Sequence, residues 1–163
     1  MLVHFSLFLL LHLSPPTSFN TKQLRASYHE AIYQEDKAKA LLTDLKNIPS
    51  PSAIQKAYLG STQMLMAKFT YLPNQKFSWF NTGKKNLEEA IAADPKQAEI
   101  IYLRYSIQLN VPSFLGYSQN KAADRAFLLQ EIRKIQDKDL QERIKLFLLK
   151  EASLTQQERA LLP

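Results

Sequence analysis

The stretch RYSIQLNVPSFLGY, residues 104–117, carries the residue types in this chain that are best suited to binding a ligand. Arg104 and Gln108 are one helical turn apart, so on a helix they share a face. A guanidinium donates hydrogen bonds to carboxylates, and an amide both donates and accepts them. The pair could therefore bind a carboxylate or a peptide backbone in a groove. A buried Arg104 would instead need an acid such as Glu88 or Glu89 beside it.

The same stretch also has the features of a helix end joined to a loop. Asn110 can satisfy the last carbonyls of the helix, Pro112 prevents its continuation, and Gly116 permits a positive φ. We favour this structural interpretation, with a ligand contact as the alternative. The residues expected to contact a partner are Trp79, Arg104, Gln108 and Tyr117.

No other residues form a recognisable catalytic or metal-binding group. His29 has no second histidine or acidic cluster at metal-ligand spacing. Glu88 and Glu89 are adjacent and point to different sides of a helix, which makes them a poor acid–base pair. Ser61 lies in no nucleophile elbow, and the absence of cysteine excludes thiolate catalysis and Cys-ligated zinc. We expect no enzyme activity, cofactor or metal, unless a cleft brings Arg104, Glu88 and His29 together.

The positive charge of the chain is spread along it rather than clustered. The formal net charge is +6, and residues 19–73, 74–117 and 118–163 contribute excesses of 3, 1 and 2 basic groups. Proteins that bind nucleic acid usually cluster Lys and Arg in order to neutralise phosphates. We therefore expect no nucleic-acid partner, whereas weak association with an anionic membrane surface stays open.

The first residues have the composition of a targeting segment. Residues 2–13 are almost wholly apolar and end at Ser14-Pro15-Pro16. This length fits a secretory signal peptide and is too short to cross about 30 Å of hydrocarbon. We expect residues 1–18 to be a signal peptide, or alternatively an N-terminal helix that lies on the membrane. Residues 19–163 would then be a single exported domain in the periplasm or cell envelope.

Apolar periodicity and scarce strand signals predict an all-α fold beyond this segment. The connections between apolar runs are short, which favours antiparallel helical hairpins. Thr155-Gln156-Gln157-Glu158 is a capping box and predicts a short C-terminal helix. About six longer helices are expected before it, at residues 21–47, 52–72, 83–95, 96–110, 120–136 and 139–152.

Aromatic residues are densest in the segment 71–81, which holds Phe77, Trp79 and Phe80. Such a cluster can anchor a partner, because Trp and Phe are good interface residues, but more often it belongs to a core. Phe77 and Phe80 share a helical face, and Trp79 points away from it. We expect Phe77 and Phe80 in the core and treat Trp79 as the candidate for a surface contact.

Residues 57–95 resemble a degenerate tetratricopeptide repeat. AYLG at 57–60 matches the end of the first helix of such a repeat, and GKKNLEEAIAADP at 83–95 matches its second helix and terminating proline. Gly60 and Gly83 take the small positions at which the two helices approach closely. The segment is longer than a standard repeat, with the excess in TYLPNQKFSWF. The resemblance implies stacked helical hairpins and a concave surface that binds peptides or proteins.

The chain also resembles small, uncharacterised exported bacterial proteins that share the string LRYSIQxNxPxFLGY, a resemblance that implies no particular activity. The leading hypothesis is an exported, non-enzymatic helical interaction protein with a protein or peptide partner. The alternative is a helical domain that binds a small ligand or lipid in a closed pocket lined by Phe77, Phe80 and Tyr105.

Overall fold

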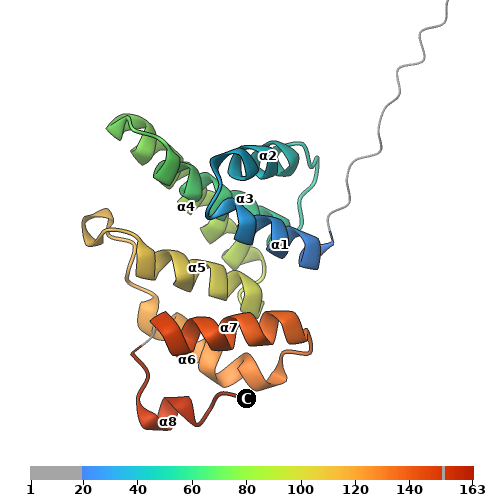
Figure 1. The fold of residues 1–163 in the computed structure, drawn as a ribbon, viewed down its shortest axis with the longest axis vertical. Helices are drawn as coiled ribbons and strands as arrows, with labels where there is room; N and C mark the ends of the chain where they lie inside the picture. Colours follow the sequence, from blue (N-terminus) through green and yellow to red (C-terminus); the bar gives the residue numbers. More distant parts are fainter. Residues whose placement is uncertain (1–19, 152) are drawn as a thin grey trace, which may run out of the picture.

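The structure, a computed structural model, describes residues 20–151 and 153–163 and confirms the all-α fold. These residues contain no strand, and their helices pack as hairpins that follow one another along the molecule (Figure 1). The expected signal peptide, residues 1–18, lies outside the described residues. The elements are α1 (Thr21–Ala31), α2 (Glu35–Lys46), α3 (Ala53–Phe69), α4 (Pro73–Ala93), α5 (Ala98–Asn110), the 3-10 turn η1 (Ser113–Leu115), α6 (Lys121–Glu131), the 3-10 turn η2 (Ile132–Lys134), α7 (Lys138–Glu151) and α8 (Gln156–Arg159).

The single helix expected at residues 21–47 is two helices, and this expectation was wrong. The chain turns at Ile32 and Tyr33, and α2 begins at Glu35. A continuous helix would place Glu35 on the apolar stripe that α1 buries. The turn instead places Glu35 in the first turn of α2, where the helix dipole favours a carboxylate. α2 can then bury a stripe of its own against α3.

The aromatic segment 71–81 and the helix expected at 83–95 form one continuous helix, α4. Pro73 occupies its first turn, where a missing N–H costs nothing. α4 packs along α3 over most of its length (Figure 1). This hairpin is the longest among the described helices and makes one side of the fold.

Two glycines allow α3 and α4 to approach closely, as the sequence predicted. A Cβ on Gly60 would lie 2.6 Å from the carbonyl oxygen of Gly83 and 2.7 Å from the backbone nitrogen of Leu87. A Cβ on Gly83 would clash with the carbonyl oxygen of Gly60. Only glycine fits at either position, because backbone atoms cannot move aside without shifting a whole helix.

Hydrogen bonds from two arginines anchor the C-terminal part of the chain. Arg133 donates to the carbonyls of Ala160, Leu161 and Leu162, and Arg125 donates to Ser153 and to Glu158. The capping box at the start of α8 is formed as predicted, with Thr155 and Glu158 each bonding to the backbone of the other. None of the described helices is both long and apolar enough to span a membrane.

Candidate functional site

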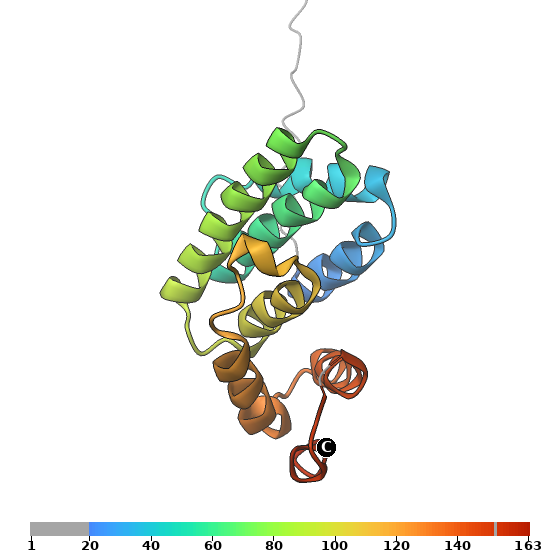
Figure 2. The same ribbon diagram turned by 90° about the vertical axis from the view of Figure 1, so that its left-hand side faces the viewer.

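A large apolar groove runs between the helical pairs. Its volume is about 1000 Å³, and it is open to solvent along one side. Its walls come from α1, α3, α5 and α7, the first helix of each successive pair, with the start of α4 and residues 111–115. Figures 1 and 2 both place α5 between α1 and α7. We therefore call α5 the floor of the groove, with α1 and α7 as the walls on either side of it. The volume lies at the upper end of the range of ligand-binding sites.

The groove is lined mainly by aromatic and aliphatic side chains, and its mouth is unusually apolar for a surface. Tyr33 is 71% exposed and Phe114 is 75% exposed, and Leu146 and Phe77 are also well exposed. All four line the groove, and the rings of Phe77 and Phe114 pack edge to face, with centroids 6.5 Å apart. A cluster of exposed large apolar side chains around a depression marks an interaction site more often than a chance feature.

The ionisable residues that line the groove are basic or tyrosine, and no described Asp or Glu side chain is among them. Lys68 and Lys76 flank the short connection between α3 and α4. The Lys68 ammonium donates to the carbonyl of Ile32 at 2.7 Å and lies 6.0 Å from the ring centroid of Tyr33. Neither lysine forms an ion pair within the described residues.

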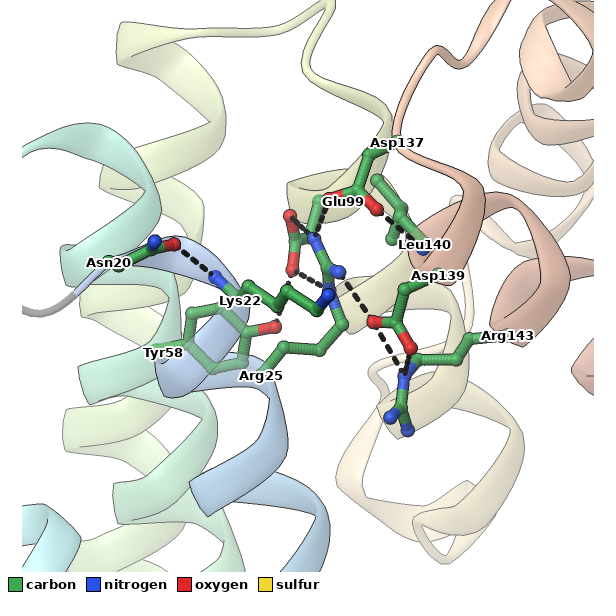
Figure 3. Close-up of polar contacts among 9 residues, drawn as sticks. All are labelled: Asn20, Lys22, Arg25, Tyr58, Glu99, Asp137, Asp139, Leu140 and Arg143. Carbon is green, nitrogen blue, oxygen red and sulfur yellow. Dashed lines mark hydrogen bonds and ion pairs between the residues drawn. The ribbon is translucent and has the colours of Figure 1, made fainter.

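A buried charge cluster joins the helices of the groove walls, and Arg25, Tyr58 and Arg143 of this cluster line the groove (Figure 3). Arg25 of α1 donates to both oxygens of Glu99 on α5, at 2.7 and 2.9 Å. The same guanidinium reaches Asp137 at 2.9 Å and Asp139 at 2.6 Å, at the start of α7. The Tyr58 hydroxyl of α3 donates to Glu99 at 2.6 Å. One arginine thus joins three carboxylates, and the cluster fixes α1, α3, α5 and α7 relative to one another.

The charged groups of the cluster shift one another's pKa values. Burial opposes the charge on Arg25, but hydrogen bonds to Glu99, Asp137 and Asp139 outweigh it and raise the pKa of Arg25 further. Hydrogen bonds from Arg143 and Arg25 hold the pKa of Asp139 below its usual value, and the bond from Arg25 does the same for Asp137. Burial, together with the neighbouring Glu99, raises the pKa of Tyr58 and keeps its hydroxyl protonated. The pKa values of Arg25, Tyr58, Asp137 and Asp139 all shift away from neutral pH, which favours a structural role.

Arg104 belongs to a second network that holds the loop after α5. It donates to both oxygens of Asp124 on α6, at 2.8 and 2.6 Å, and to Glu88 on α4 at 3.1 Å. The Tyr117 hydroxyl donates to the other oxygen of Glu88. Gly116 has a φ of 61°, a positive value of the kind that the glycine permits. This geometry supports the structural interpretation of residues 104–117; Glu88 was among the acids expected, and Asp124 was not.

The four residues expected to contact a partner do not meet at one surface. Arg104, Gln108 and Tyr117 are buried, and none of them lines the groove. Both amide atoms of Gln108 lack a hydrogen-bond partner among the described residues. Trp79 is half-buried, with the Lys46 ammonium 5.4 Å from its ring, on the side of α2. Their role in partner binding stays a prediction.

The pocket expected for a small ligand is only partly matched. Phe77 and Phe80 line the groove, but Tyr102 lines it in place of Tyr105, and the space is open rather than closed. Arg104 and Glu88 meet, but His29 lies apart at the groove, where its ring packs against Tyr33. Among the described residues, no three or more His, Asp or Glu side chains are placed so that they could hold a metal ion.

Sequence reasoning missed both the groove and the Arg25 cluster. Two members of the cluster were detectable as polar residues at positions that the apolar pattern assigns to the core. Arg25 occupies the same helical stripe as Tyr28, and Glu99 lies at the start of a helix that is apolar on most sides. No family model matches the chain, and no curated protein or solved structure is significantly similar to it.

Proposed function

We propose that this protein is an exported helical interaction module that holds an apolar segment of a partner protein in the groove between its helical pairs. The observation that carries the proposal is the groove, whose mouth gathers half of the exposed large apolar side chains of the described residues. These side chains stand at the rim, where a protein surface would cover them. The apolar N-terminus supports the proposed export.

The groove is already formed before a partner segment binds. Its walls are packed helices that one buried ion cluster holds together, so binding requires little ordering of the protein. The aromatic side chains of the lining have few rotatable bonds and lose little entropy on contact. The apolar face of a partner segment would fill the volume, and the rim would exclude water around it.

A second candidate is the binding of a lipid or another apolar small molecule in the same groove. The volume of about 1000 Å³ and the apolar lining favour it. A small ligand inside the groove would, however, leave Tyr33, Phe114 and Leu146 exposed at the mouth. We therefore rank the protein segment first.

Fluorescence anisotropy with a labelled model peptide tests the proposal. The probe is an uncharged 18-residue amphipathic helix with leucines on one face and glutamines on the other. We expect saturable binding, and we expect Leu146→Asp and Phe114→Asp each to weaken it about tenfold, because they place a charge where apolar side chains must pack. Both side chains are exposed, so these variants should fold.

Leu161→Asp is the matched control, since Leu161 is similarly exposed but does not line the groove. Trp79→Ala tests whether that residue contributes from outside the groove. Absence of binding, or equal loss with the control, would show that the groove does not hold an apolar helix. Binding of the fluorescent fatty acid cis-parinaric acid without peptide binding would support the second candidate.

A further inference from the structure

Two lysines without a described ion-pair partner line the groove close to one another in the chain. Six basic residues line it: Arg25, His29, Lys68, Lys76, Arg143 and Lys150. Arg25 is surrounded by three carboxylates, and Arg143 is paired with Asp139 at 3.0 Å, so the charges of both are already met. Lys68 and Lys76, on either side of the connection between α3 and α4, are not paired with any described carboxylate. This corner of the groove is therefore positive, and no described acid lines the groove to offset it.

On the basis of the proposed function, we infer that the segment held in the groove is an acidic amphipathic helix. Its apolar stripe faces the floor, and carboxylates at one end of the helix meet Lys68 and Lys76. A partner with basic residues at that end would be repelled, so the lysines select among apolar helices.

A helix fits the walls better than an extended peptide does. The described walls are helices whose backbone groups are bonded within the helices, and they present no strand edge to pair with. An extended segment would bury unpaired N–H and C=O groups against aromatic side chains, at a cost for each group. A helix satisfies its own backbone groups and presents only side chains.

A second copy of this chain fits the groove less well. A symmetric dimer formed through this face would bring the same patch of both copies together. Lys68 and Lys76 of one copy would then face the groove of the other, which no described carboxylate lines. The charge pattern thus favours a different, acidic partner.

Three labelled 18-residue peptides test the inference on the full chain. They share one leucine stripe and carry glutamate, glutamine or lysine at the same polar positions near one end. We expect the glutamate peptide to bind about tenfold more tightly than the lysine peptide, with glutamine between them, from two exposed charge contacts that change from attraction to repulsion. The preference should shrink between low and high salt, because exposed charges are screened.

Lys76→Glu and Lys68→Glu should each reduce the preference for the glutamate peptide, and together reverse it. Lys96→Glu is the matched control, since Lys96 is exposed on the α4–α5 connection and does not line the groove. Equal affinities for the three peptides, or a preference unchanged by both lysine variants, would overturn the inference and leave the proposed function intact. If none of the peptides binds, the proposed function fails as well. Binding of cis-parinaric acid or of phosphatidylglycerol vesicles with no peptide preference would assign the lysines to a lipid headgroup and also overturn it.

Discussion

Replacing Arg25 should be one of the most damaging single changes in this protein. Glu99 has only 5% of its side chain exposed and takes two of the four hydrogen bonds of the arginine. In Arg25→Met, Glu99 keeps only the Tyr58 hydroxyl and becomes a buried charge without a counter-ion. Breaking a buried pair in this way costs about 3–5 kcal/mol.

The other two partners contribute less. The side chains of Asp137 and Asp139 are 43% and 31% exposed, so water screens their interaction with Arg25. Exposed or half-exposed pairs contribute about 0–1 kcal/mol each. We therefore expect a total loss of about 3–5 kcal/mol, which is a large part of the stability of an ordinary domain.

Urea unfolding followed by circular dichroism at 222 nm measures this loss. Glu99→Gln is the informative comparison, because the amide still accepts from Tyr58 and Arg25 keeps both aspartates; it should lose less than Arg25→Met. A loss below about 1 kcal/mol in Arg25→Met would refute the reasoning, since it would mean that water or a movement of α7 satisfies Glu99.

Three further expectations follow from the packing and the charges. Gly60→Ala should lower the free energy of unfolding, measured in urea, by about 1–3 kcal/mol, because its Cβ would lie 2.6 Å from the backbone of α4. Gly116→Ala is the comparison, since its Cβ would meet nothing within 4 Å and only its positive φ would be strained. Gln108→Met should raise the free energy of unfolding by about 1 kcal/mol, because it removes a buried amide that has no partner among the described residues. A loss of stability would mean that a buried water bonds the amide. Stability should fall as the pH drops below the usual aspartate pKa of 3.8, because the pKa values of Asp137 and Asp139 are lowered in the folded state and the unfolded chain takes up protons first. The fall should be shallower in Arg25→Met. An unchanged slope would mean that Arg25 does not lower these two pKa values.

The sequence was sufficient for the all-α fold, for most of the helices and for several individual contacts, because those depend on local pattern. The close approach at Gly60 and Gly83, the positive φ at Gly116 and the capping box at Thr155 each follow from a residue type in a recognisable context. The break after α1 did not follow, because the helical stripe of residues 21–47 continues through Ala38 and only Glu35 interrupts it. A single charged residue on a stripe can be tolerated or can end the helix, and the packing against α3 decides which.

The groove could not be read from the sequence because no segment contains it. It is the space left between helices that lie as far apart in the chain as α1 and α7, and its size depends on how those helices are held. The Arg25 cluster had a partial signal in Arg25 and Glu99, each polar at a position that the apolar pattern reserves for the core. Asp137 and Asp139 lie around the start of α7, where acids are ordinary, so nothing marked them as partners.

The position of the cluster gives it a role that stability alone does not explain. Replacing a buried ion pair by apolar residues of similar size is often neutral or stabilising, so such a pair is better suited to fixing an arrangement than to strengthening it. Arg25 connects α1 to α5 and α7, and it sets the distance between these three helices, which share few other contacts with one another. In Arg25→Met/Glu99→Met we expect much of the stability lost in Arg25→Met to return, while the walls are free to approach one another. The double variant should then bind the leucine-striped peptide more weakly than the parent although it unfolds at a similar urea concentration. Parent-like peptide binding in a stable double variant would show that the helices keep the groove open without the ions.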